Sequence, residues 1–194
     1  CLDKFRADIE ASPLNTPSGR IEIYSERIAS FNYDDCPGHP VWQEPAEWLG
    51  ASAAARYPLH LISNQPHTKL HSQYDHGAVS LANKIRGREP IAMHPGDAAA
   101  RGLKAGDIVR VFNGRGACLA GLRIEMGLRP GVVEMATGAW YDPLEPGRIG
   151  TLDKHGNPNV LTLDKGSSKL GQGCIAHSCL VEIGRYDAEL PPIP

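Results

Sequence analysis

The chain has 194 residues, of which 41% are hydrophobic, so it can bury a core in one domain with appendages. Its 20 basic and 22 acidic residues give a formal net charge of -2 and are mixed along the sequence, which disfavours a nucleic-acid binder. No apolar run approaches the roughly 20 residues that span a bilayer, so we expect no membrane insertion. The five scattered cysteines favour reduced thiols over a disulfide framework.

The first 55 residues differ in character from the rest of the chain. They contain many prolines and glycines and little hydrophobic periodicity, which is typical of an arm or linker. Within them only Arg20–Tyr24 alternates in a way that predicts a short strand. We therefore expect an arm over residues 1–55 and a folded domain over residues 56–194.

The folded domain is predicted to be mainly β with short helices. Asp97–Arg101 predicts a helix that ends at Gly102, and Asn113–Gly116 predicts a hairpin in which glycine accepts a positive φ. Short strands with glycine-rich turns are typical of a closed β-barrel. The predicted strands are Tyr57–Ser63, Ile108–Phe112, Ala117–Ile124, Val132–Met135 and Cys179–Ile183.

A polar loop follows the first of these strands and is the strongest candidate for a ligand site. Its amide, hydroxyl and imidazole groups both donate and accept hydrogen bonds, which suits a large polar ligand such as a pterin. A solvated loop without a ligand is the alternative. His67 and His71 are four residues apart, but no acidic or cysteine partner stands at metal-site spacing, so we predict no metal ligand. The polar side chains that concern us are Ser63, Asn64, Gln65, His71, Ser72 and Gln73.

Three later segments could also contact a ligand. The amides around Pro158 could hold a turn or bind a ligand, and the glycine- and serine-rich loop 166–173 could offer backbone N–H groups to phosphate. The aromatic pair Trp140-Tyr141 could fill the core or stack on a heterocycle. A Walker loop, a Rossmann glycine motif and a hydrolase nucleophile elbow are all absent from the sequence.

Several of these motifs, taken in order, resemble the dimethyl sulfoxide reductase family of molybdopterin oxidoreductases, and in particular its trimethylamine N-oxide and biotin sulfoxide reductase branch. The resemblance covers nearly the whole chain. The segments that carry it are 16–22, 61–66, 70–73, 106–113, 115–116, 138–141, 157–162, 168–170 and 172–173.

The resemblance implies a six-stranded double-psi β-barrel that binds bis-molybdopterin guanine dinucleotide together with the other domains of a parent enzyme. It implies reduction of a small S-oxide or N-oxide, with residues 1–55 leading in from the preceding domain. No residue of this chain is expected to be catalytic or to ligate molybdenum. Lys69 stands where the resemblance leads us to expect arginine, which weakens a planar contact but keeps the charge. Cofactor contact is implied for Ser63, Asn64, Gln65, His71, Ser72 and Gln73, and also for Asn159 and Gln172.

Two other functions remain open at this point. A stand-alone double-psi barrel could serve as a protein-interaction or substrate-recognition module, because one fold hosts many functions. A small self-processing decarboxylase on a related barrel would need an activated serine after glycine, and Gly166-Ser167 is a weak match. The resemblance to biotin sulfoxide reductase favours a cytoplasmic location, whereas the N-oxide reductases favour the periplasm.

Overall fold

A computed structural model describes residues 2–193, and the chain in it forms two compact units. The arm unit contains the residues up to Glu44 together with Lys165–Cys174, and the barrel unit contains Pro45–Asp164 and the residues from Ile175 onward. The domain boundary expected between residues 55 and 56 stays a prediction. Among the described residues, no helix has the length and apolar character needed to cross a membrane.

The arm unit contains little regular structure. It has two short helices, α1 (Asp3–Ala7) and α2 (Glu26–Ala29), and the hydroxyl of Ser25 caps α2 by accepting a hydrogen bond from the backbone N–H of Ile28. The strand predicted at Arg20–Tyr24 is wrong, because this segment forms bends and irregular backbone. The side chains of Ile21 and Ile23 are 69% and 78% exposed, so the alternating pattern has no buried face to stabilise a strand.

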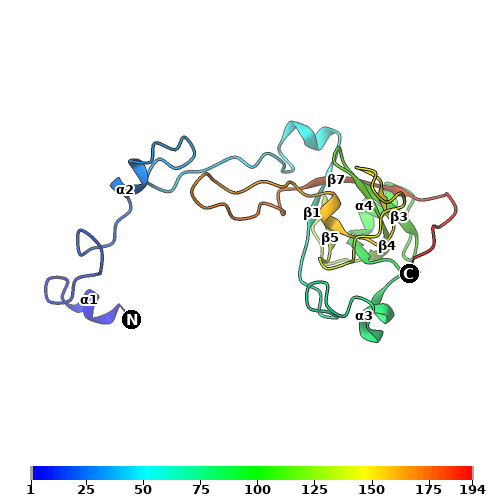
Figure 1. Cartoon of the computed structure of the whole chain (residues 1–194), viewed down its shortest axis with the longest axis horizontal. Helices are drawn as coiled ribbons and strands as arrows, with labels where there is room; N and C mark the ends of the chain where they lie inside the picture. Colours follow the sequence, from blue (N-terminus) through cyan, green and yellow to red (C-terminus); the bar gives the residue numbers. More distant parts are fainter. Residues whose placement is uncertain (1, 194) are drawn as a thin grey trace. The chain divides into compact units, whose positions relative to one another are not determined.

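The barrel unit is built on a closed ring of strands. The ring runs β2 (Pro90–Met93), β5 (Val132–Met135), β1 (Leu59–Ile62), β7 (Leu180–Arg185), β3 (Ile108–Phe112) and β4 (Ala117–Ile124), and the pairing of β4 with β2 closes it (Figure 1). The first residues of β4 also pair with β6 (Leu152–Asp153). The predicted mainly β, six-stranded double-psi barrel is confirmed.

Parallel and antiparallel pairs alternate irregularly around this ring. The pairs β1–β5 and β2–β4 are parallel, and each joins strands that are distant in the sequence, whereas β3 pairs with both β4 and β7 in antiparallel fashion. Because β1 and β5 are neighbours that run in the same direction, the segments that follow them leave the barrel at the same end. This arrangement places two polar loops side by side.

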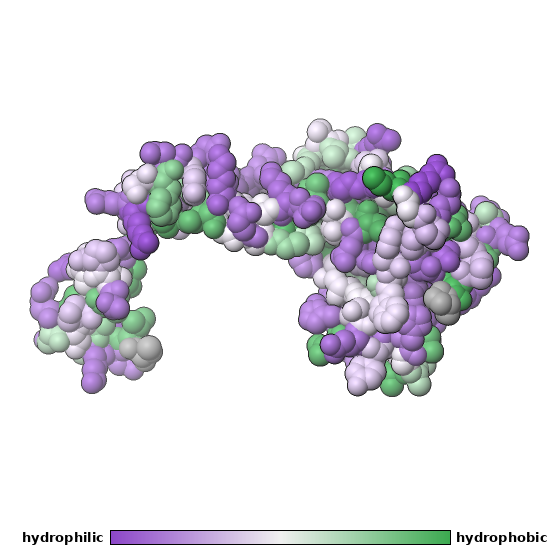
Figure 2. Space-filling view, in the orientation of Figure 1, coloured by the Kyte–Doolittle hydropathy of each residue, from purple (hydrophilic) through white to green (hydrophobic). Residues whose placement is uncertain are grey.

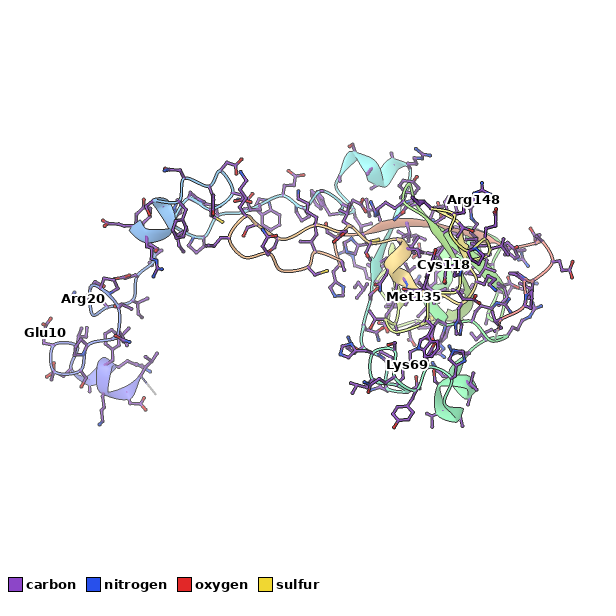
Figure 3. The ribbon with its side chains drawn as sticks, viewed as in Figure 1. Glu10, Arg20, Lys69, Cys118, Met135 and Arg148 are labelled. Atoms are coloured by element: carbon purple, nitrogen blue, oxygen red, sulfur yellow. The ribbon has the colours of Figure 1, made fainter. Side chains whose placement is uncertain are left out.

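The core of the barrel is aliphatic and contains sulfur-bearing side chains. Cys118 and Met135 are fully buried inside it (Figure 3), and the register of β3 against β4 brings Val111 opposite Cys118. Cys36, Cys118, Cys174 and Cys179 are all free thiols, as the prediction required of these four. On the outside, hydrophilic and hydrophobic residues are interspersed over the visible face of the barrel unit (Figure 2). The other buried members of the core include Leu59, Leu61, Ile91, Met93, Val109, Ala120, Leu122, Val133, Leu161, Val181 and Ile183.

Short helices complete the unit, and the sequence expectations about one helix and one turn need correction. The helix predicted at Asp97–Arg101 begins two residues earlier, as α4 (Pro95–Ala99), where the side chain of His94 caps it and Asp97 stands in its first turn. The hairpin between β3 and β4 forms as predicted, yet neither Gly114 nor Gly116 has a positive φ. Gly116 is needed for space instead, since a Cβ there would lie 2.6 Å from the carbonyl oxygen of Val160. The remaining helices are η1 (Ser52–Ala55), α3 (Ala78–Asn83) and η2 (Pro158–Val160).

Candidate functional site

A cleft of about 660 Å³ opens on the barrel unit where three segments meet. One wall comes from the loop after β1, a second from the segment after β5, and a third from the turn that contains η2. Four of the eight predicted contact residues, namely Gln65, His71, Ser72 and Asn159, line this cleft. The other lining residues are Thr137, Gly138, Ala139, Trp140, Tyr141 and Asn157.

The first two walls are held against each other by close backbone contact. Gly138 has a φ of +97°, and a Cβ on it would lie 1.9 Å from the carbonyl oxygen of His71, so only glycine fits there. The indole N–H of Trp140 donates to the carbonyl oxygen of Ser72 at 2.8 Å, and the backbone N–H of Thr137 donates to the carbonyl oxygen of Asn64 at 2.9 Å. His71 itself has a φ of +51°, which marks a tight turn in the loop.

The aromatic pair in the second wall is open to the cleft. Trp140 and Tyr141 are 55% and 54% exposed, so the possibility that they fill the core is wrong. Their rings belong to the lining of the cleft, where an aromatic face can stack on a flat heterocycle. The rings of Trp140 and His76 also form a T-shaped pair, with a centroid distance of 4.8 Å.

The third wall is fixed by one buried carboxylate. Asp153 is fully buried, and its Oδ1 accepts hydrogen bonds from the backbone N–H groups of His155, Gly156 and Asn157 at 3.2, 2.7 and 2.8 Å. The side-chain oxygen of Asn157 then caps η2 by accepting from the N–H of Asn159 at 3.0 Å. Of the two uses considered for these amides, Asn157 therefore holds the turn, while Asn159 is exposed at the cleft.

The lining carries no carboxylate, lysine or arginine side chain within the part of the chain that the structure describes. Its polar groups are amides, hydroxyls, an imidazole and an indole. Amide and hydroxyl groups can match a ligand edge that mixes donors and acceptors, and they impose no charge repulsion on a phosphate. The cleft is thus suited to a polar heterocycle with an attached uncharged or anionic group.

A group of four buried charged side chains lies behind the cleft; we call Lys69, Asp75, Lys84 and Glu89 the buried-charge cluster. Lys69, for which the resemblance implies a weakened ligand contact, lies in the loop between β1 and α3 (Figure 3), and its side chain is fully buried. Its ammonium group contacts the carboxylates of Asp75 and Glu89, and its side chain has no exposed surface. The charge of Lys69 is therefore balanced within the protein and does not face the cleft.

Ionisation in this region is set by burial and by the cluster. Burial alone would raise the pKa of Asp75, but hydrogen bonds from Lys69, Lys84 and the Trp140 N–H outweigh it and hold that pKa well below its usual range. Burial and the positive charge of Lys84 lower the pKa of His155 to about 4, so this imidazole is neutral at pH 7. Its Nε2 lies 2.6 Å from Nζ of Lys84 and accepts the hydrogen bond.

Donor atoms of Asp75, His76 and His155 lie within 4.8 Å of one another, which is a spacing that a metal ion could use. The surroundings disfavour a cation there, because Asp75 already pairs with two lysines and the ammonium group of Lys84 occupies Nε2 of His155. The two positive and two negative charges of the buried-charge cluster balance, so a divalent ion would add uncompensated charge.

The other four predicted contacts lie outside the cleft and stay predictions. Ser63 is buried, and its backbone N–H lies 3.4 Å from Nδ1 of His177, while the amide of Asn64 donates to Glu134 at 2.8 Å beside a smaller hollow of about 170 Å³. Gln73 makes a tight turn through its N–H to the carbonyl of Leu70. Gln172 belongs to the arm unit, where its side chain donates to the carbonyl oxygen of Ser168.

Sequence reasoning missed two residues that line the cleft and the charged residues that support it. Thr137 and Gly138 were not proposed, although a glycine three residues after the strand β5 was a usable signal. Asp75 follows the polar loop closely, but Lys84, Glu89 and His155 come from separate segments. Nothing in the spacing of these residues indicates that they meet.

Comparison with known proteins identifies the family. Residues 59–180, which include every strand of the ring in whole or in part and the complete cleft, match the model of the Molydopterin dinucleotide binding domain. The chain belongs to this family.

Curated relatives match along almost the whole chain. It is 48% identical over 182 residues to dimethyl sulfoxide/trimethylamine N-oxide reductase of Cereibacter sphaeroides, covering 94% of this chain and 22% of that protein. It is 48% identical over 191 residues to trimethylamine-N-oxide reductase 1 of Escherichia coli K12, covering 97% of this chain and 22% of the relative. Biotin sulfoxide reductase of Cereibacter sphaeroides is 50% identical over 182 residues, covering 94% of this chain and 24% of the relative. The chain therefore spans about a fifth to a quarter of the length of these relatives.

A solved structure supports the fold independently of close sequence identity. Acetylene hydratase from Pelobacter acetylenicus superposes with a TM-score of 0.71 over 90% of this chain and 24% of that chain, at 20% identity. At this identity the likeness concerns the fold alone.

Proposed function

We propose that this chain is the cofactor-binding part of a longer molybdenum oxidoreductase, here called the parent enzyme, that reduces small S-oxides or N-oxides. Membership of the Molydopterin dinucleotide binding domain family and the high identity to S-oxide and N-oxide reductases support this proposal. The observation that carries it is the cleft, in which four residues that the family resemblance implies as cofactor contacts lie beside an exposed tryptophan.

The residues of the cleft fit a pterin guanine dinucleotide. The amides of Gln65 and Asn159 and the hydroxyl of Ser72 can each pair with the mixed edge of a pterin or guanine ring. Trp140 presents a ring that is more than half exposed for stacking, and the lining brings no carboxylate against a diphosphate. Since a cleft of about 660 Å³ is within the ordinary range for small-molecule sites, it would hold one portion of a cofactor of this size.

In the parent enzyme, bis-molybdopterin guanine dinucleotide would supply the molybdenum and the two-electron chemistry. The residues of this chain would orient the dinucleotide, bury part of it and hydrogen-bond to it, and the remaining domains of the parent would complete the site. The wall of amides and hydroxyls is what separates this proposal from a stand-alone interaction module, which has no need of a polar cleft beside an aromatic ring. A cytoplasmic location is the preferred prediction, on the likeness to biotin sulfoxide reductase.

The proposal is tested by removing two polar groups that line the cleft on different walls. The double variant His71→Ala/Asn159→Ala of the parent enzyme should contain at most one third of the guanine nucleotide and molybdenum per polypeptide that the unmodified enzyme contains. Lys104→Ala, on an exposed turn before β3, is the matched control and should retain full content. Unchanged guanine content in the double variant would show that the cleft is not the dinucleotide site.

A further inference from the structure

Asp75 is the residue through which the buried-charge cluster reaches the cleft. Its Oδ1 accepts hydrogen bonds from the ammonium groups of Lys69 and Lys84 at 2.7 and 2.8 Å. Its Oδ2 accepts from the backbone N–H of Trp140 at 3.0 Å. The two oxygens thus have separate tasks, one toward the cluster and one toward the aromatic wall of the cleft.

The cluster costs desolvation energy that a stable fold does not require. The four side chains are between 0% and 2% exposed, and buried ion pairs of this kind are often no more stabilising than apolar side chains of the same volume. What the cluster does provide is a fixed orientation of the Asp75 carboxylate. Two ammonium groups on one oxygen fix the plane of the Asp75 carboxylate, so that its second oxygen faces the N–H of Trp140.

Two hydrogen bonds hold Trp140, and with it the aromatic wall, against the loop that contains Asp75. The backbone of Trp140 is held by Asp75, and its indole N–H is bonded to the carbonyl oxygen of Ser72, three residues before Asp75 in the same loop. Gly138 packs directly against His71 of that loop. The loop and the aromatic segment therefore form one clamped pair of walls with Asp75 at its base.

We infer that Asp75 is a positioning residue, which Lys69 and Lys84 orient so that it fixes Trp140 for stacking on the bound dinucleotide. The inference rests on the proposed function, because it names how this chain prepares the same cleft. Asp75 does not line the cleft and acts only through Trp140.

Glu89 offers a matched control within the same cluster. Its carboxylate contacts the same two lysines, with Lys84 at 3.1 Å, and its side chain is equally buried. In the described part of the chain, the hydrogen bonds of its side chain do not include the segment 137–141. Loss of charge at Glu89 therefore disturbs the cluster as much as loss at Asp75 but spares the link to Trp140.

Asp75→Asn is the informative substitution. The two ammonium groups require the amide oxygen of asparagine on their side, which turns its NH₂ group toward the N–H of Trp140, donor against donor. In Glu89→Gln the amide oxygen can keep facing the lysines without creating such a conflict. Hydrogen exchange of the Trp140 backbone N–H, followed by NMR on the protein, reads the link directly without any cofactor.

We expect Asp75→Asn to accelerate exchange of the Trp140 N–H at least tenfold relative to a barrel amide such as that of Leu119, and Glu89→Gln to change it less than threefold. In the parent enzyme, Asp75→Asn should lower the guanine nucleotide content at least threefold, and Glu89→Gln should not. Equal acceleration in both variants, or a protected Trp140 N–H in Asp75→Asn, would overturn the inference.

The two proposals fail in distinguishable ways. If Asp75→Asn frees the Trp140 N–H but keeps the full guanine content, while His71→Ala/Asn159→Ala lowers that content, the positioning role is wrong and the proposed function stands. If the His71→Ala/Asn159→Ala variant also keeps its content, the proposed function is wrong. If Asp75→Asn does not fold, hydrogen exchange of the Trp140 N–H is measured in the unmodified protein instead. Exchange at the rate of an unprotected amide would overturn the inference. Exchange that is at least a hundredfold slower would support it.

Discussion

Acidification should destabilise the barrel unit through one histidine. His155 is buried and neutral, with a pKa of about 4, because burial and Lys84 both disfavour its protonated form. In the unfolded chain its pKa returns to about 6.5, so the unfolded state binds the extra proton first as the pH falls. The stability that this group contributes is thus complete above pH 6.5 and is lost between about pH 6.5 and pH 4. The loss amounts to about 2 kcal/mol at pH 5, at 1.36 kcal/mol for each unit of pKa difference.

The assay is urea unfolding at pH 7.5, 6.0 and 5.0, compared between the unmodified protein and His155→Gln. Glutamine keeps an acceptor for Lys84 but does not titrate, so the variant should lose much less stability between pH 7.5 and 5.0 than the unmodified protein does. Asp75 does not interfere, because its pKa is held well below its usual range and its contribution is lost only at still lower pH. Parallel pH dependences of the two proteins, or a measured His155 pKa near 6.5, would refute the reasoning.

Three further predictions follow from single contacts. Gly138→Ala should lower the free energy of unfolding by about 3 kcal/mol and reduce the cofactor content of the parent enzyme, because it adds a Cβ against the carbonyl of His71 at a positive φ. Gly147→Ala, at a φ of +84° with nothing within 4 Å, should lower it by only about 1 kcal/mol. Equal losses in urea unfolding would contradict this prediction. Asp153→Ala should cost on the order of 3 kcal/mol by calorimetry, because it leaves the buried N–H groups of residues 155–157 without an acceptor, and a loss under 1 kcal/mol would argue against that role. Glu47→Gln should lower the free energy of unfolding in urea by about 1 kcal/mol, because it weakens the contacts with Arg115 and Leu180. Glu145 pairs with Arg148 on the surface, so Glu145→Gln should cause no measurable change. A larger loss in Glu145→Gln than in Glu47→Gln would contradict this prediction.

The strands of the barrel were accessible from local sequence because each has a strong apolar pattern. Ile108–Phe112, Ala117–Ile124 and Val132–Met135 were predicted with the bounds that the structure shows, as a consequence of their β-branched and aliphatic residues. The strand β2 was missed, because it begins at a proline, which cannot donate a backbone hydrogen bond to a neighbouring strand. Arg20–Tyr24 was overpredicted for the opposite reason, since alternation indicates a strand only where one face becomes buried.

The candidate site was predictable only where its residues are contiguous. Gln65, His71 and Ser72 were found through one polar loop, and Asn159 through its place beside a proline. The clamp formed by Asp75 and Trp140 could not be found in this way, because these residues are brought together by the parallel pairing of β1 with β5. The same holds for Glu89 and His155, which meet the loop only after the barrel has closed.

The most direct measurement of the central claim is a crystal structure of the parent enzyme with its cofactor bound. The account predicts that the pterin guanine dinucleotide lies in the cleft, within hydrogen-bonding distance of Ser72 or Asn159 and with one of its rings against Trp140. A dinucleotide that contacts none of these three residues would contradict it.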